Sequence, residues 1–582
     1  MRHLDGGVVG THTSVLGLRS APPGTPFSEE TRVRAQRWKT WRVAVLSAAL
    51  ATAVTVPASA LVSGAPGEQR SSSSSPGREA FRGQHPVVRT DKGLVRGEAA
   101  AMVTSFKGIP YAAPPVRDLR WRAPRPARAW SGVRDATEFG GSCVQGTGWD
   151  PGYDQPTLTE DCLYLNVYRP SGSRSKNLPV FVWNHGGGNV GGAGRDTDPS
   201  KFVTRRDVVY VTINYRIGAM GWLDTPALEA DNRDGSTGNF GLLDQQAALR
   251  WVQRNIRSFG GDPNNVTLAG QSAGASNTVA QLASPGARGL FDRAALHSGG
   301  GNPARTLEAA RTSGERFAAE LGCTDPATQV ACLRAASPAE VLAAQTTVRQ
   351  SGPVAGTRVL PRDPVELMKA RRLTDLPVIV GANSDESQQS VFGAYDYVGN
   401  PITPEMFDEL VTTTYGEQAD RVRAAYQVED YFSPTVAWGD VQSDQRACRD
   451  QTLRDRLGAD TRTYAYEFAE QDGPPFTSIW LLDTDYPFGA THVNELGYLW
   501  DYLGTSLPLS TDQLALSDQM ISYWGEFARD GSPDPRYAPQ WPRYRPQGRM
   551  LQFTAPTARV VTHAAIDAQH GCALWDEVAP AP

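Results

Sequence analysis

The stretch Val-Thr-Leu-Ala-Gly-Gln-Ser-Ala-Gly at residues 266–274 decides how the fold of this chain is interpreted. An apolar run leads into Gly-Gln-Ser-Ala-Gly, and the small residues that follow are compatible with a helix. The order strand, sharp turn, helix places Ser272 on a strained corner, and Gly270 and Gly274 let neighbouring backbone approach because they lack a Cβ. The pattern predicts a nucleophile elbow. Because an ordinary Gly-rich turn can have the same composition, the prediction depends on partners found elsewhere.

The composition is that of a globular protein. Hydrophobic residues make up 40% of the 582 residues and charged residues 20%, which is enough to bury a large core, and 57 Gly and 42 Pro predict many loops. The net charge is −5. A mildly acidic protein has no electrostatic basis for binding nucleic acid or an anionic membrane, so we expect neither partner.

The first 60 residues have the pattern of a secretion signal. A basic segment at 32–42 precedes an apolar segment at 43–56, which is followed by small residues ending at Ala60. We therefore expect cleavage after Ala60 and a secreted protein. The alternative is a membrane anchor at 43–62, but this segment is rich in Ala and Thr and shorter than the roughly 20 strongly apolar residues that a span needs.

Beyond the signal, residues 61–84 are polar and low in complexity, which predicts a flexible linker. Residues 85–582 contain no repeat or second linker, so we expect a single catalytic domain. An even number of cysteines, all beyond Ala60, fits disulfides in an exported protein, although the sequence alone does not choose their pairing. No Cys-x-x-Cys pair or tight Cys/His cluster predicts a metal, and no cofactor is implied. The six are Cys143, Cys162, Cys323, Cys332, Cys448 and Cys572.

Apolar strand candidates alternate with amphipathic helices from residue 85 onward. Leu249, Val252 and Ile256 recur at helical spacing, and so do apolar residues within 516–527. Continuously apolar strands separated by helices predict an α/β fold with a mainly parallel sheet covered on both faces. In such sheets ligands bind beyond the carboxyl ends of the strands. The main strand candidates are residues 180–183, 208–213, 266–268, 376–380 and 463–468.

A glycine loop follows the strand candidate at 180–183. Asn-His-Gly-Gly-Gly at 184–188 has bare backbone N–H groups that can turn toward one point. Together with the N–H of Ala273, just after the elbow serine, Gly187 and Gly188 are predicted to form an oxyanion hole. The alternative is a loop that only turns a corner.

The acid and the base of a catalytic triad are sought after Ser272, because nucleophile, acid and base follow one another in this fold. Asp385 and Glu386 follow the strand candidate at 376–380, and spacing alone does not say which of them orients a base. Four histidines follow the elbow, and the chain order excludes His297. His492 lies in a Gly-containing loop with room for an imidazole to face the elbow, whereas the remaining two lie near the terminus. They are His563 and His570.

From about Val87 to Val578 the chain resembles the type-B carboxylesterase family, which includes carboxylesterases, cholinesterases and bile-salt-type lipases. The matching runs include Phe-Lys-Gly-Ile-Pro-Tyr-Ala-Ala-Pro-Pro at 106–115 and Glu-Asp-Cys-Leu-Tyr-Leu-Asn-Val at 160–167. Phe-Gly-Gly-Asp-Pro at 259–263, directly before the elbow strand, is especially specific. The resemblance covers nearly all of the chain beyond the linker.

The resemblance implies Ser272 as nucleophile, Glu386 as acid and His492 as base, with Glu495 at the family's acidic position three residues after the histidine. It also implies the disulfides Cys143–Cys162, Cys323–Cys332 and Cys448–Cys572. Three departures from the family pattern concern the pocket and not the triad: Asn184, Asn189 and His297.

The function that these residues imply is hydrolysis of neutral carboxylic esters through an acyl-enzyme. Choline-hydrolysing relatives carry Glu where this chain has Gln271, so we expect neutral esters to be preferred over choline esters. Trp149 lies where such relatives place a Trp that could contact a cation. The alternatives are a lipase or another acyl hydrolase, and a binding module without activity. The oligomeric state is not indicated.

Overall fold

The computed structural model describes residues 85–147, 156–476 and 484–578. The predicted signal at 1–60, the linker at 61–84 and Trp149 lie outside the described residues. The described residues all belong to one unit of the chain, Val62–Pro582. In this described part, no helix is both long and apolar enough to cross a membrane.

The strand β7 (Leu178–Asn184) shows how the sequence produces a sheet with two buried faces. All seven of its residues are buried. Val180 and Val182 belong to one hydrophobic cluster, whereas Phe181 and Trp183 belong to another. Because successive side chains of a strand point to opposite faces, a continuously apolar strand can satisfy both faces only if helices cover each of them.

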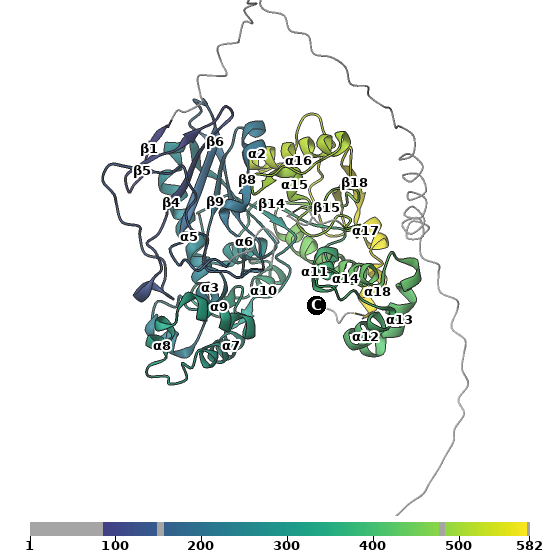
Figure 1. The fold of residues 1–582 in the computed structure, drawn as a ribbon. Coiled ribbons are helices and arrows are strands. Elements are labelled where there is room, and N and C mark those ends of the chain that lie inside the picture. The colour runs from purple at the N-terminus through teal and green to yellow at the C-terminus, as the bar shows by residue number, and fades with distance from the viewer. Residues whose placement is uncertain (1–84, 148–155, 477–483, 579–582) are drawn as a thin grey trace, which may run out of the picture. The chain divides into compact units, whose positions relative to one another are not determined.

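β7 lies inside an 11-stranded mixed sheet, which Figure 1 shows between helices. The inner strands from β9 to β17 run parallel, and the strands beyond them on both edges pair antiparallel. The prediction of an α/β fold with a mainly parallel sheet is therefore confirmed. In spatial order the strands are β18 (Arg559–Thr562), β17 (Arg549–Phe553), β15 (Thr463–Phe468), β14 (Val378–Asn383), β11 (Arg293–His297), β10 (Gly261–Gln271), β7, β9 (Val209–Ile213), β6 (Tyr164–Pro170), β4 (Val103–Pro110) and β3 (Glu98–Ala99).

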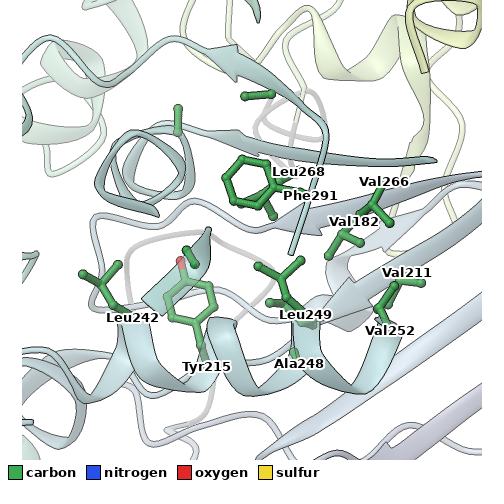
Figure 2. Packing of buried hydrophobic residues seen from close by; sticks show 14 of the residues in the cluster. Val182, Val211, Tyr215, Leu242, Ala248, Leu249, Val252, Val266, Leu268 and Phe291 are labelled. Carbon is green, nitrogen blue, oxygen red and sulfur yellow. The ribbon is translucent and has the colours of Figure 1, made fainter. Parts of the chain in front are cut away.

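Helices cover both faces of this sheet. On one face α5 (Phe240–Asn255) packs its apolar side against the strands, and Figure 2 shows Leu249 and Val252 beside Val182 and Val211. The same face carries α6 (Ala273–Ala283), α10 (Pro364–Lys369) and α14 (Pro434–Asp460). The opposite face carries α2 (Ser200–Arg206) and α16 (Thr511–Asp530).

The remaining elements lie outside the main sheet. Short strands form three small sheets, which are β1 (Val87–Arg89), β2 (Leu94–Arg96) and β5 (Val133–Asp135); β12 (Arg305–Thr306) and β13 (Val354–Ala355); and β8 (Thr197–Asp198) and β16 (Asp501–Tyr502). The other helices are α3 (Gly218–Trp222), α4 (Pro226–Asp231), α7 (Leu307–Glu320), α8 (Gln329–Ala335), α9 (Pro338–Thr347), α11 (Gln388–Ala394), α12 (Pro404–Tyr415), α13 (Ala419–Ala425), α15 (Leu496–Leu499), α17 (His563–Gln569) and α18 (Cys572–Val578).

Element bounds differ from the expected ones where burial extends past the apolar run. β10 continues to Gln271, three residues beyond the expected end, because its polar last residue is also buried between neighbouring strands. The helix expected to include Ile256 ends at Asn255, and the chain tightens into a 3₁₀ turn at Ile256–Phe259 that closes on Gly260. Gly260 has φ of 89°, a left-handed conformation that favours glycine.

Three disulfides join the six cysteines in the pairs that the family resemblance implies, namely Cys143–Cys162, Cys323–Cys332 and Cys448–Cys572. The third connects α14 to α18 across 124 residues of sequence. It therefore ties the last described helix to the long helix that packs on β14 and β15.

Candidate active site

Ser272 occupies the single residue between the end of β10 and the start of α6. Its backbone has φ of 54° and ψ of −120°, a conformation that non-glycine residues avoid. The corner is held on both sides, because the Ser272 N–H donates to the carbonyl of His297 at 2.8 Å and its own carbonyl accepts from Ser276 at 3.0 Å. The sharp turn that the sequence predicts is therefore present at this serine.

The two glycines of the elbow are required by backbone contacts. A Cβ on Gly270 would collide with the backbone of Gly274, and a Cβ on Gly274 would collide with the carbonyl oxygen of Asn184. Asn184 is the last residue of β7, the neighbouring strand. The glycines therefore let β7, the turn and the start of α6 approach one another at the carboxyl edge of the sheet.

Glu386 and His492 lie in contact beyond the same edge. Glu386 follows β14, is 1% exposed, and its Oε2 lies 2.5 Å from His492 Nδ1. Burial alone would raise the pKa of Glu386, but the charges of Arg446 and His492 and a hydrogen bond from the Asn383 N–H lower it to about 2. An ionised Glu386 can only accept, so His492 Nδ1 carries a proton that it donates to this carboxylate.

The structure also shows what the neighbouring carboxylate does. Asp385 is 5% exposed and accepts hydrogen bonds at Oδ2 from the Ala490 N–H at 3.0 Å and from the Gln471 amide at 2.7 Å. It therefore holds the loop that precedes His492, and among the described residues no hydrogen bond joins Asp385 to the imidazole. The two adjacent carboxylates point to different partners, which spacing alone left open.

His492 Nε2 is occupied by a side-chain amide. Gln271, directly before Ser272, places its Nε2 2.9 Å from His492 Nε2 and is 2% exposed. In the neutral imidazole with its proton on Nδ1, Nε2 is the acceptor and the Gln271 amide is the donor. Among the described residues, no hydrogen bond joins Ser272 Oγ to His492.

The glycine loop after β7 lies against the elbow. Gly187 and Gly188 have φ of 88° and 61°, and a Cβ on the preceding Gly186 would lie 3.4 Å from Ser272 Cβ. Within the described ranges, the N–H groups of Gly187, Gly188 and Ala273 make no hydrogen bond. Three free donors next to a serine are the arrangement that an oxyanion requires.

A model described as the carboxylesterase family matches residues 84–575. The chain belongs to the carboxylesterase family. It is 33% identical over 481 residues to fumonisin B1 esterase of Sphingopyxis macrogoltabida, covering 80% of this chain and 86% of that protein. It is 32% identical over 492 residues to para-nitrobenzyl esterase of Bacillus subtilis, covering 80% of this chain and 94% of that protein.

Solved structures give the same result for the fold. A structure of PNB esterase superposes with a TM-score of 0.68 at 29% identity, covering 84% of this chain and all of that one. This carboxylesterase therefore has the α/β-hydrolase fold and is a serine ester hydrolase of the type-B group, which acts on small-molecule esters. The interpretation as a binding module without activity is set aside.

The imidazoles of the other histidines that follow Ser272 in the carboxylesterase have hydrogen-bond partners other than the elbow residues. His297 is fully buried, with its Nδ1 3.0 Å from the Tyr466 hydroxyl and its Nε2 accepting from the Trp524 indole. His570 is 1% exposed and bonded to Asp444 and Glu467. The imidazole of His563 contacts Tyr544, Asp455 and Asp567. His492 is therefore the one of these four histidines whose imidazole contacts an elbow residue, Gln271.

Two contributors to the site were not found from the sequence of this esterase. Arg446 of α14 places Nη1 3.2 Å from Glu386 Oε2 and donates from Nη2 to the Ser298 carbonyl at 2.7 Å. The loop at 298–302 follows β11 and passes beside Ser272. A single arginine within a long polar helix carries no sequence signal for a site, because its neighbours along the helix are also charged.

A cavity of about 390 Å³ opens beside Ser272. Its wall includes Ser272, Ala273 and Gly188, so both the elbow and the last glycine of the glycine loop line it. A space of this size holds a small ester, and clefts of a few hundred Å³ are typical of small-molecule sites. Among the described residues, no group of His, Cys, Asp and Glu is placed to hold a metal ion.

Proposed function

We propose that Ser272 is the nucleophile of this esterase, His492 the general base and Glu386 the acid that orients it. Gly187, Gly188 and Ala273 supply the oxyanion hole. The observation that carries the proposal is the 2.5 Å contact between Glu386 and His492 at the same edge of the sheet as the strained Ser272. No cofactor takes part in this mechanism.

The reaction proceeds through an acyl-enzyme. Ser272 Oγ attacks the ester carbonyl as His492 Nε2 takes the hydroxyl proton, and the three backbone N–H groups stabilise the tetrahedral oxyanion. His492 then gives this proton to the leaving alcohol. Water, deprotonated by the same nitrogen, attacks the acyl-enzyme and releases the acid. Throughout, Glu386 stabilises the imidazolium, which its low pKa allows because it stays ionised.

This mechanism requires an exchange of hydrogen-bond partners at His492 Nε2. The nitrogen accepts from Gln271 in the resting structure and has one lone pair to offer. The Ser272 hydroxyl must replace the amide before it can transfer its proton. Hydrogen bonds at catalytic groups are often formed only when substrate is bound, so this exchange fits a resting enzyme.

We further propose that neutral carboxylic esters are hydrolysed in preference to cationic choline esters. The residue next to the nucleophile is a neutral amide, which stabilises a quaternary ammonium less than a carboxylate would. The names of the relatives, fumonisin B1 esterase and para-nitrobenzyl esterase, support an ester of a small organic molecule as substrate. A lipase or another acyl hydrolase of the same fold is the second candidate, since nothing at the elbow depends on chain length.

The same proposal includes secretion, with a signal at 1–60 cleaved after Ala60 and a linker at 61–84 before a catalytic domain at 85–582. Three disulfides support it, because disulfides persist in oxidising compartments. The alternative of an anchor at 43–62 is separated from secretion by determining the N-terminal residue of the exported protein.

The assignment of Ser272 is tested by Ser272→Ala, which removes one oxygen at a corner and leaves the fold intact. We expect hydrolysis of nitrophenyl esters to be abolished while the circular dichroism spectrum and melting temperature stay the same. An organophosphate should label Ser272 in the wild type and label nothing in the variant. Residual activity above about one part in a thousand of wild type would rule out the assignment.

A further inference from the structure

The cavity beside Ser272 is polar and carries an excess of positive charge. It is lined by three arginines and one carboxylate, and the described residues contribute no aromatic side chain to its wall. Its polar lining is completed by serines, Asn189 and Asn302. The charged residues are Arg305, Arg446, Arg449 and Asp450.

The three arginines differ in what they already bind. Arg305 donates to Ser313, Gln350 and the Trp222 carbonyl, and Arg446 is held by Glu386 and the Ser298 carbonyl. Arg449, one turn further along α14, makes no hydrogen bond and no ion pair within the described part of the chain. It is exposed toward the cavity that Ser272 lines. A guanidinium with all of its donors free is suited to a carboxylate.

A second unused donor lies in the same wall. Ser298 is 1% exposed, and its Oγ is buried without a hydrogen-bond partner. Buried hydroxyls are normally hydrogen-bonded, so this atom lacks a partner that a ligand oxygen could supply. Ser298 begins the loop that passes the nucleophile, where a Cβ on Gly299 would collide with the Ser272 carbonyl oxygen.

The position of the cavity identifies the half of the ester that it receives. Neither His492 nor Gln271 lines it, whereas Ser272 and the oxyanion donors Gly188 and Ala273 do. The leaving alcohol must lie beside His492, because that imidazole protonates it. The cavity therefore lies on the opposite side of the scissile carbonyl and holds the acyl group.

We propose that this cavity binds esters whose acyl chain ends in a carboxylate, with Arg449 as the cation that recognises it and Ser298 Oγ as a further donor. The inference rests on the proposed role of Ser272 and refines the proposed substrate preference. We expect esters with an anionic acyl group to be hydrolysed best, neutral esters less well, and choline esters least well. The free acid released is then a dicarboxylate.

The test compares monoethyl adipate with the ethyl ester of adipamic acid, in which the distal carboxylate is replaced by an uncharged amide of the same shape. We expect kcat/KM to be about tenfold higher for the carboxylate ester, and the ratio to shrink with added salt because the contact is partly solvated. With the charge moved to the alcohol, as in 6-acetoxyhexanoate and its amide, no such preference is expected.

Matched variants assign the preference to Arg449. Arg449→Gln should bring the ratio between the two adipate derivatives close to one, and Arg449→Lys should restore part of it. Arg456→Gln removes the same charge from the same helix outside the cavity, so it should leave the ratio at the wild-type value. Melting temperatures of all three establish that they fold.

Two results would overturn the inference: a wild-type ratio near one, or a ratio that Arg449→Gln leaves unchanged. A preference that follows the charge on the alcohol would also overturn it. The proposed role of Ser272 is tested by a different result, because it is contradicted only if Ser272→Ala still hydrolyses both esters. If Ser272→Ala is inactive and the ratio is near one, the triad stands and the anionic acyl site does not.

Discussion

The side-chain amide of Gln271 lies 2.9 Å from His492 Nε2, the nitrogen that accepts the Ser272 proton in the proposed mechanism. An amide N–H at this place donates to the lone pair of Nε2, so the Ser272 hydroxyl has to displace it before proton transfer. A carboxylate at residue 271 would instead place a negative charge beside the nucleophile. The residue before the nucleophile thus affects both the hydrogen bonding of the base and the charge of the substrate that the site accepts.

Replacing Gln271 by Glu should therefore narrow the gap between neutral and choline esters. In the wild type we expect a neutral ester to have the higher kcat/KM than a choline ester with the same acyl group. In Gln271→Glu, the carboxylate attracts the quaternary ammonium and this difference should fall. A wild-type preference for the cation of about tenfold would contradict the proposed role of the neutral amide.

Removing the charge of Glu386 should lower kcat on the order of a thousandfold, because the amide of Glu386→Gln lacks the charge that stabilises the imidazolium and can also donate to Nδ1, which favours the wrong tautomer of His492. Asp385→Asn is the matched control. It changes the neighbouring carboxylate, which accepts from Ala490 and Gln471 among others, so it should lower the melting temperature while kcat stays within about tenfold of wild type. Equal losses of kcat in the two variants would contradict the assignment of the acid.

The sequence predicts the fold and the elbow well because both depend on local patterns. An apolar run such as β7 indicates a buried strand, and the glycines around Ser272 indicate a close approach of backbone segments. The choice between Asp385 and Glu386 depends instead on side-chain direction in a turn, which spacing does not contain. Arg446 and Arg449 belong to α14, which lies more than a hundred residues after Ser272 in the sequence. No local sequence pattern distinguishes them from the other charged residues of this helix.

The disulfides should differ in their contribution to stability according to the length of chain that each closes. Cys448–Cys572 spans 124 residues and Cys323–Cys332 spans 9. In the chain-entropy model the longer loop contributes about 4 to 5 kcal/mol and the shorter somewhat less than about 3 kcal/mol. Double Cys→Ala variants, compared by urea denaturation, should show the larger loss for the 448–572 pair.

Peptide mapping without reduction gives an independent check on the pairing. It should recover the three pairs seen in the structure and no free thiol. Three or more free thiols in protein exported by its native route would contradict the assignment of structural disulfides.

Stability should fall at alkaline pH because of His570. Burial acts to lower its pKa, but the charges of Glu467 and Asp444 raise the pKa of His570 from the ordinary 6.5 to about 10. This ion pairing contributes fully below about pH 6.5 and is lost as the pH rises through about 10. Between these values the free energy of unfolding of His570→Gln should depend less on pH than that of the wild type. Parallel curves for the two proteins would contradict a charged His570.

The groups assigned to catalysis come from segments that follow four different strands of one sheet, namely β7, β10, β14 and β15. The last of them, His492, is encoded late in the chain, and the disulfide at Cys572 closes the fold only after it. Under the proposed mechanism, a chain that ends before residue 492 lacks its general base, and we expect it not to hydrolyse an ester. In a refolding experiment, the recovery of activity therefore measures the fraction of completely folded protein. A spectroscopic signal from the first half of the sheet would also include partly folded molecules.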